Sequence, residues 1–74
     1  MTGSEIRSER AKAGISVELL AMRAGIERTR VTRIELGYVQ PRPEEAQRLR
    51  AALDDLADAR EKVAAVAAEV GWPL

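Results

Sequence analysis

The apolar residues of this chain recur with helical spacing and predict a series of short helices. The residues that share one face of each helix are Ile6, Arg10 and Ala13 in residues 4–13, Leu20, Ala21 and Ala24 in residues 17–24, and Val31 and Ile34 in residues 28–36. No stretch shows the alternation of apolar and polar residues typical of a β-strand. The sequence therefore predicts an all-α fold, a small bundle of four to five helices. Each short segment ends at a glycine, a residue suited to the left-handed conformation that often follows a helix: Gly14, Gly25 and Gly37.

Capping residues support the same boundaries. Thr2 followed by Glu5 fits a capping box for the first helix, and Ser16 is a good N-cap for the second. Pro41 and Pro43 exclude a continuous helix between the third segment and the next one. Residues 38–43 are therefore expected to form a loop.

A much longer helix is predicted from residue 44 to residue 70, which contain no Gly or Pro and many Ala. A straight helix of this length spans about 40 Å, too long to pack wholly against three short helices. It either bends near Asp54-Asp55 and folds back, or its second half meets another chain. Its apolar stripe favours self-association, through Leu56, Val63, Val66 and Val70. Gly71, Trp72 and Pro73 follow as a stop signal.

The composition excludes several classes of function. The chain has no Cys and no His, so it lacks disulfides, thiolate zinc sites and the commonest general base. No apolar run approaches the roughly 20 residues that span a bilayer, and no signal segment is visible. Asp54, Asp55 and Asp58 are interpreted as a solvated helix face. We expect a cytoplasmic domain with no metal, no cofactor, no membrane contact and no enzymatic activity.

Charge is balanced overall but is uneven along the chain. Residues 1–50 hold ten basic and seven acidic side chains, a net charge of +3, whereas residues 51–74 have a net charge of −3. Arg28, Arg30 and Arg33 form the densest basic cluster, with no acid between residues 28 and 34. Because screening limits each charge to about 8–10 Å at ordinary salt, a phosphate responds to this local cluster rather than to the neutral total.

Two short helices joined by a glycine-containing turn, the second with outward Arg and Thr, form a helix-turn-helix pattern. Ala21 is small where the two helices cross, Gly25 supplies the turn, and Val31 and Ile34 anchor the second helix. The run from residue 15 to residue 37 resembles the phage-repressor, or Xre-type, helix-turn-helix family, and the resemblance covers residues 5–53. It implies sequence-specific binding of double-stranded DNA by residues 1–53. Residues 54–74 would then be a helical extension for self-association or a partner.

The resemblance also implies which side chains meet DNA. Outward residues near the start of the second helix contact base edges in this family; here these are Arg28, Thr29, Thr32 and Arg33. The positions that would contact the DNA backbone are Val17, Arg23, Arg30, Tyr38 and Arg42, and Arg7 could also contact it. Arginine suits guanine O6 and N7, so guanine-containing half-sites are expected.

Arg10 and Glu35 resemble the family's structural ion pair between the first and third helices. Two positions depart from the pattern. Val17 stands where the family commonly has a Gln that holds a phosphate, and Glu27 stands where a Ser or Thr would cap the third helix.

Two functions remain open. The first is a homodimeric transcriptional regulator, repressor-like and bacterial or phage-encoded, that reads the major groove with residues 28–36. The second is a protein-interaction module whose long C-terminal helix binds a protein partner. The arginine cluster favours DNA, whereas Val17 and Glu27 favour the second.

Overall fold

The computed structural model describes residues 2–71 and consists there of four helices and no strand. They are α1 (Gly3–Lys12), α2 (Val17–Ala24), α3 (Arg28–Glu35) and α4 (Pro43–Glu69). The all-α prediction is confirmed, and the helix ends fall within one residue of the expected ones. Trp72 and Pro73, expected to follow the end of the last helix, lie outside the described residues.

Local capping explains where the short helices begin and turn. Thr2 Oγ1 accepts a hydrogen bond from the Glu5 backbone N–H at 3.2 Å, and Ser16 Oγ accepts one from Leu19 N–H at 3.1 Å. Each hydroxyl satisfies a backbone donor that the first turn of a helix leaves without a partner. Gly25 follows α2 with a φ of 69°, a left-handed conformation that costs glycine little.

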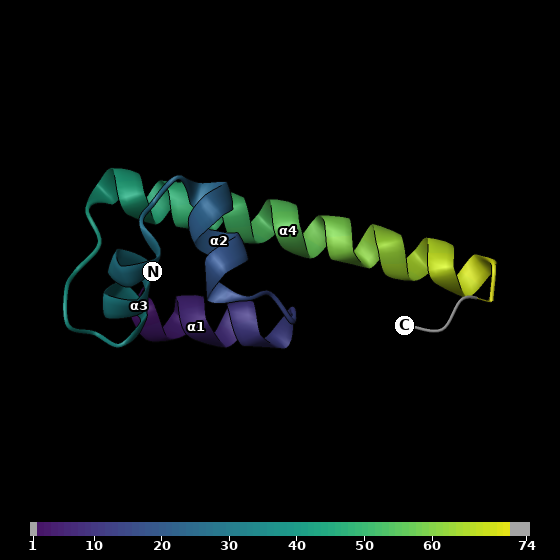
Figure 1. Cartoon of the computed structure of the whole chain (residues 1–74), viewed down its shortest axis with the longest axis horizontal. Helices are drawn as coiled ribbons and strands as arrows, with labels where there is room; N and C mark the ends of the chain where they lie inside the picture. The colour runs from purple at the N-terminus through teal and green to yellow at the C-terminus, as the bar shows by residue number, and fades with distance from the viewer. Residues whose placement is uncertain (1, 72–74) are drawn as a thin grey trace.

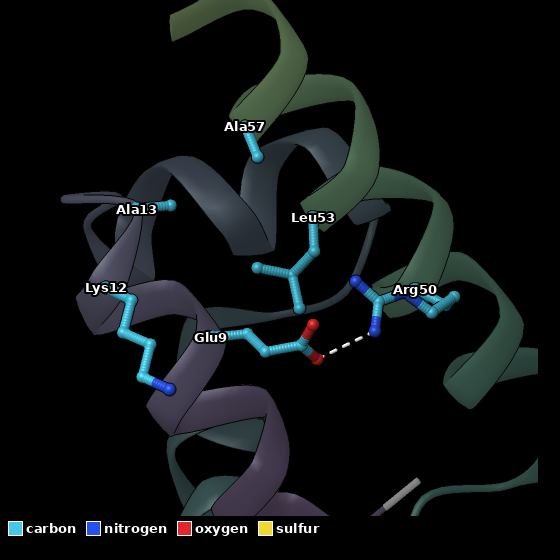
Figure 2. A pocket seen from close by; sticks show the side chains of 6 residues that line it. All are labelled: Glu9, Lys12, Ala13, Arg50, Leu53 and Ala57. Atoms are coloured by element: carbon cyan, nitrogen blue, oxygen red, sulfur yellow. Dashed lines mark hydrogen bonds and ion pairs between the residues drawn. The ribbon is translucent and has the colours of Figure 1, made fainter. Parts of the chain in front are cut away.

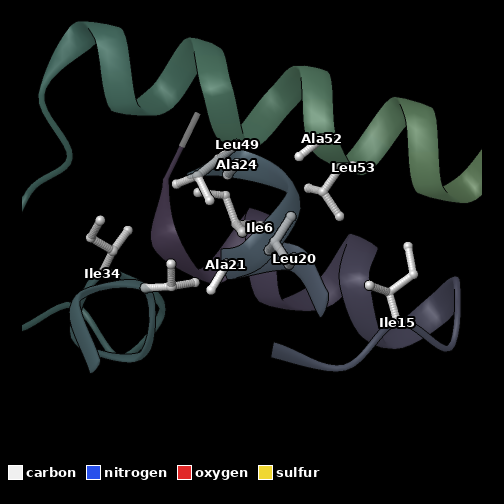
Figure 3. Close-up of a cluster of buried hydrophobic side chains, with 10 residues drawn as sticks. Ile6, Ile15, Leu20, Ala21, Ala24, Ile34, Leu49, Ala52 and Leu53 are labelled. Atoms are coloured by element: carbon white, nitrogen blue, oxygen red, sulfur yellow. The ribbon is translucent and has the colours of Figure 1, made fainter. Parts of the chain in front are cut away.

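The first half of α4 closes a small core over the three short helices (Figure 3). Ile6 from α1, Leu20 from α2 and Ile34 from α3 meet Leu49 and Leu53 from α4, and all five are almost completely buried. Leu56 and Ala57 are the last α4 residues packed against this cluster. We call α1–α3 together with residues 43–57 the body of the molecule.

The start of α1 packs tightly against the end of α3. A Cβ atom built on Gly3 would lie 1.8 Å from the carbonyl oxygen of Ile34. Only glycine allows this approach of one backbone to another. Gly3 is therefore a packing residue in the first turn of a helix, where a glycine is otherwise expected to weaken the helix.

The last helix is unbroken and runs beyond the body (Figure 1). It continues through Asp54-Asp55 without folding back, so the first of the two alternatives for this helix is wrong. The described chain measures 43 × 18 × 18 Å, a shape set by this helix. We call residues 58–69 of α4 together with its C-cap residue, Val70, the free half of α4. No helix within residues 2–71 is both long and apolar enough to cross a membrane.

The point where α4 leaves the body is marked by small and charged residues (Figure 2). Ala57 of α4 lies across from Ala13, which follows α1, with Leu53 between them and the core. Arg50 Nη1 donates to Glu9 Oε2 at 2.7 Å and so ties α4 to α1. The residues of α4 that follow Ala57 do not belong to the core cluster.

Candidate nucleic-acid interface

Helix α3 packs one face against the core and exposes the opposite face to solvent. Val31 and Ile34 are buried in the core, and both are almost completely inaccessible. On the other face Arg28, Thr29 and Arg33 are exposed, and Thr32 is half-buried. The rigid attachment leaves a row of guanidinium and hydroxyl groups on an outer helical surface.

The turn before this helix fixes its angle to α2. Ala21 is buried where α2 and α3 pack, and the Ile26 N–H donates to the Ala21 carbonyl at 3.0 Å. Glu27 is the N-cap residue of α3, and its side chain makes no capping hydrogen bond. Its carboxylate instead lies at the positive end of the helix dipole.

A surface hollow brings together side chains from three helices. It is lined by Arg7 and Arg10 of α1, Val17 of α2, Arg28, Thr32 and Glu35 of α3, and Leu36, the C-cap residue of α3. Two expected base-reading residues, Arg28 and Thr32, therefore share one concave surface with Val17 and Arg7, both expected near the DNA backbone. Val17 is half-buried, and its side chain packs against the core. A phosphate at this position could be bound only through the backbone N–H.

Arg10 and Glu35 join α1 to the end of α3. Arg10 Nε and Nη2 donate to the two carboxylate oxygens of Glu35 at 2.8 and 2.9 Å, and Arg10 Nη1 donates to the Ile15 carbonyl at 2.9 Å. The side chains are 18% and 5% exposed, so the pair is shielded from water. The hydrogen bonds to Glu35 raise the pKa of Arg10. Each of the three guanidinium nitrogens donates a hydrogen bond inside the molecule, which supports a positioning role.

Arg30 forms a second two-bond pair, with Glu45 in the first turn of α4. Its Nε and Nη2 donate to Glu45 Oε2 and Oε1 at 2.5 and 2.8 Å, and the Arg42 backbone N–H also donates to Oε1 at 2.9 Å. Sequence reasoning missed Glu45, because its acidity in a first turn is already explained by the helix dipole. A phosphate contact from Arg30 would use only the N–H groups that Glu45 leaves free.

The Arg30–Glu45 pair predicts an acid-sensitive contribution to stability. The hydrogen bonds from Arg30, and then that from the Arg42 N–H, lower the pKa of Glu45 from its ordinary 4.5 to about 2. The unfolded chain therefore binds this proton at a higher pH than the folded chain does. The contribution is complete above about pH 4.5 and is lost as the pH falls towards about 2.

Urea unfolding measured between about pH 6 and about pH 3 checks this prediction. The free energy of unfolding of the wild type should decline more steeply with acid than that of Glu45→Gln, which has no proton to take up at this site. Parallel declines in the two proteins would show that Glu45 contributes nothing to the acid sensitivity.

The remaining arginines differ in their surroundings. Arg28 Nε lies 3.2 Å from Glu18 Oε1, and Arg23 Nη2 donates to Asp55 Oδ2 on α4 at 2.9 Å. Both pairs are more than half exposed. Within residues 2–71, Arg7, Arg33 and Arg42 form no ion pair. Tyr38, in the loop after α3, is exposed.

The residues expected to mediate self-association do not share one environment. Leu56 is half-buried against the molecule's own core. Val63, Val66 and Val70 lie on the free half of α4 and are exposed.

Helices α2 and α3 are joined by a turn at Gly25, and α3 has an outward polar face. This arrangement defines a small all-α domain of the helix-turn-helix class. The model of the helix-turn-helix family of the Xre, phage-repressor-like type matches residues 6–58. The chain belongs to this family, which is one of DNA-binding regulatory domains. No curated protein and no solved structure gives a significant match to the chain.

Proposed function

We propose that this chain is a transcriptional regulator that inserts α3 into the major groove of double-stranded DNA. The observation that supports this proposal is the outward face of α3, which carries Arg28, Thr29, Thr32 and Arg33. The opposite face of α3 is buried in the core. A major groove about 12 Å wide admits a helix of this kind. The segment that carries this face is also the densest basic cluster of the sequence, Arg28, Arg30 and Arg33.

The chemistry of these four residues suits base edges. An arginine donates two hydrogen bonds to guanine O6 and N7, and a threonine donates to a base or packs on a thymine methyl group. The exposed Arg28–Glu18 pair is no obstacle, since exposed ion pairs contribute only about 0–1 kcal/mol. Arg28 can exchange this partner for guanine at little cost, and Arg33 has no carboxylate partner to leave among the described residues 2–71.

Contacts to the DNA backbone would then come from residues around the outward face of α3. Arg7, Arg42 and Tyr38 are exposed and available for phosphates. Arg23 and Arg30 are turned to acids of α4, so we propose that they contribute less than these three. Such contacts fix the register of a protein on DNA without reading its sequence.

One module of this size contacts few bases, so we propose that two copies bind together, in the manner of helix-turn-helix dimers that read half-sites one helical turn apart. Residues 1–53 would be the DNA-binding domain and residues 54–74 the extension that joins the copies. Repression by blocking polymerase, in the cytoplasm of a bacterium or its phage, is the mode of action that we propose.

Selection of bound duplexes from a random pool tests the proposal. We expect enrichment of guanine-containing half-sites, and an affinity that falls steeply with salt, with a slope of about −0.9 for each phosphate contacted. A pool that remains random after selection at low salt would contradict sequence-specific binding.

A second candidate is a protein-interaction module. It is favoured by the exposed valines of the free half of α4 and by the exposed acids Glu18 and Glu27 near α3, which repel phosphates. In that case duplexes would not be enriched, and the Arg28→Ala and Arg33→Ala variants would regulate normally.

A further inference from the structure

The face of α4 that packs on the body continues as an exposed apolar stripe along its free half. Leu49, Leu56, Val63 and Val70 follow one another at seven-residue intervals. The first is buried and the second half-buried in the core, whereas Val63 and Val70 are 59% and 70% exposed. Val66 lies beside them on the stripe and is 57% exposed. On this side of α4, Val63, Val66 and Val70 are therefore presented to solvent beyond the body, whereas Ala67 beside them is buried, with 6% of its surface exposed.

A hollow of about 260 Å³ lies at the base of this stripe, where the body ends. Its lining from α4 is Leu56, Ala59, Arg60 and Val63, which are related as i, i+3, i+4 and i+7. Four residues with this spacing form the hole that receives one side chain of a neighbouring helix. Residues 14, 15 and 19, at the α1–α2 turn and the start of α2, close the hollow on the body side. It is thus shaped for the end of a second helix.

We propose that a second copy of this chain occupies the stripe, with the two free halves of α4 packed antiparallel. Val70 of each copy would enter the hollow of the other. Val63 would then lie opposite the partner's Val66, and Val66 opposite the partner's Val63. This arrangement specifies the self-association included in the proposed function, but it needs no DNA to form.

The position of the body excludes a parallel arrangement. Helices α1 and α2 lie on the side of α4 that the stripe continues (Figure 1). Two packed helices are about 8–10 Å apart, less than the roughly 10–12 Å diameter of one more helix between them. A parallel partner would bring both bodies into this same space. An antiparallel partner places them at opposite ends of the helix pair.

The charges beside the stripe agree with the antiparallel arrangement. With Val70 in the partner's hollow, Lys62 lies within about two residues of the level of the partner's Glu69, or about 3 Å along the axis. Lys62 and Glu69 occupy the same flank of the stripe, and equivalent flanks meet in an antiparallel pair. Glu69 makes no ion pair inside the described part of its own chain, and Lys62 makes only an exposed one, with Asp58 at 3.0 Å. Two opposite-charge contacts related by symmetry result.

Single cysteines test this arrangement directly, because the chain has none of its own. A disulfide requires Cα atoms within about 4.4–6.8 Å of each other. In the antiparallel pair Ala59 faces the partner's Val70, whereas the two copies of either residue are about 16 Å apart along the axis. We therefore expect no covalent dimer from oxidised Ala59→Cys alone or Val70→Cys alone, and a covalent dimer from their equimolar mixture.

The oxidation is run without DNA at high micromolar chain concentration, because a contact of some twelve residues on each copy falls below the roughly 1,200 Å² of a standard interface and is expected to be weak. Val66→Glu, introduced into both cysteine chains, is the matched control and should abolish the mixed dimer while leaving the helical circular dichroism intact. Light scattering of the wild type should show a mass rising from 8.1 kDa towards twice that value with concentration.

Three results would overturn the proposal: a covalent dimer from either cysteine variant alone, a mixed dimer that survives Val66→Glu, or a wild-type mass that stays at 8.1 kDa throughout. None of these bears on whether one copy binds DNA. Selection of duplexes therefore remains an independent test of the proposed function.

Discussion

Replacing Arg28 and Arg33 together with Ala is expected to weaken binding to the selected duplex by roughly 2–6 kcal/mol, or about 30-fold at the least. Each arginine offers two hydrogen bonds to one guanine, and each lost pair costs about 1–3 kcal/mol of discrimination. Breaking contacts inside the protein costs little of the free energy gained from these guanine contacts. Arg28 pairs with Glu18 only at an exposed surface, and Arg33 has no carboxylate partner within residues 2–71.

Fluorescence anisotropy with the selected duplex and a scrambled duplex measures this effect. Lys12→Ala is the matched control, because it removes one positive charge at the end of α1 away from α3 (Figure 1). The control should bind nearly as the wild type does. If the double variant lost affinity equally for both duplexes, the two arginines would be phosphate contacts and would not read bases.

Replacing Glu35 with Ala is expected to lower the free energy of unfolding by about 3 kcal/mol or more. The variant leaves the Arg10 guanidinium largely buried, with the Ile15 carbonyl as its remaining partner. Because a domain of this size has a total stability of roughly 4–11 kcal/mol, the loss is a large fraction of the whole.

Urea unfolding compares Glu35→Ala with two further proteins. Asp58→Ala removes an exposed pair with Lys62 and should change stability by less than about 1 kcal/mol. Arg10→Met combined with Glu35→Leu removes both charges and should be more stable than Glu35→Ala, since no charge is left unpaired. A loss for Glu35→Ala no larger than that for Asp58→Ala would remove the positioning role assigned to this pair.

The short helices could be predicted from sequence because their signals are local. A cap such as Thr2 or Ser16 and a turn glycine such as Gly25 act within a few residues, and the structure satisfies each one nearby. The direction of α4 was not predictable in this way. A seven-residue apolar repeat has the same form whether it packs on its own domain or on another chain.

Contacts between residues far apart in the sequence could not be predicted from local patterns for a related reason. Arg30 and Glu45 are fifteen residues apart, and only the tertiary fold brings the start of α4 beside α3. Gly3 is similar, because its role depends on the backbone of Ile34, thirty-one positions later. The Arg10–Glu35 pair was anticipated only through the family resemblance, since no spacing rule relates two residues on different helices.

Binding to duplexes in which the guanines of the selected half-site are replaced by 7-deazaguanine tests the central claim most directly. This base lacks the N7 acceptor of the major groove and leaves the minor groove and the phosphates unchanged. We predict a loss of about tenfold or more for the wild type, and little further loss for the Arg28→Ala/Arg33→Ala variant. Equal affinity of the wild type for the two duplexes would show that α3 does not read guanine in the major groove.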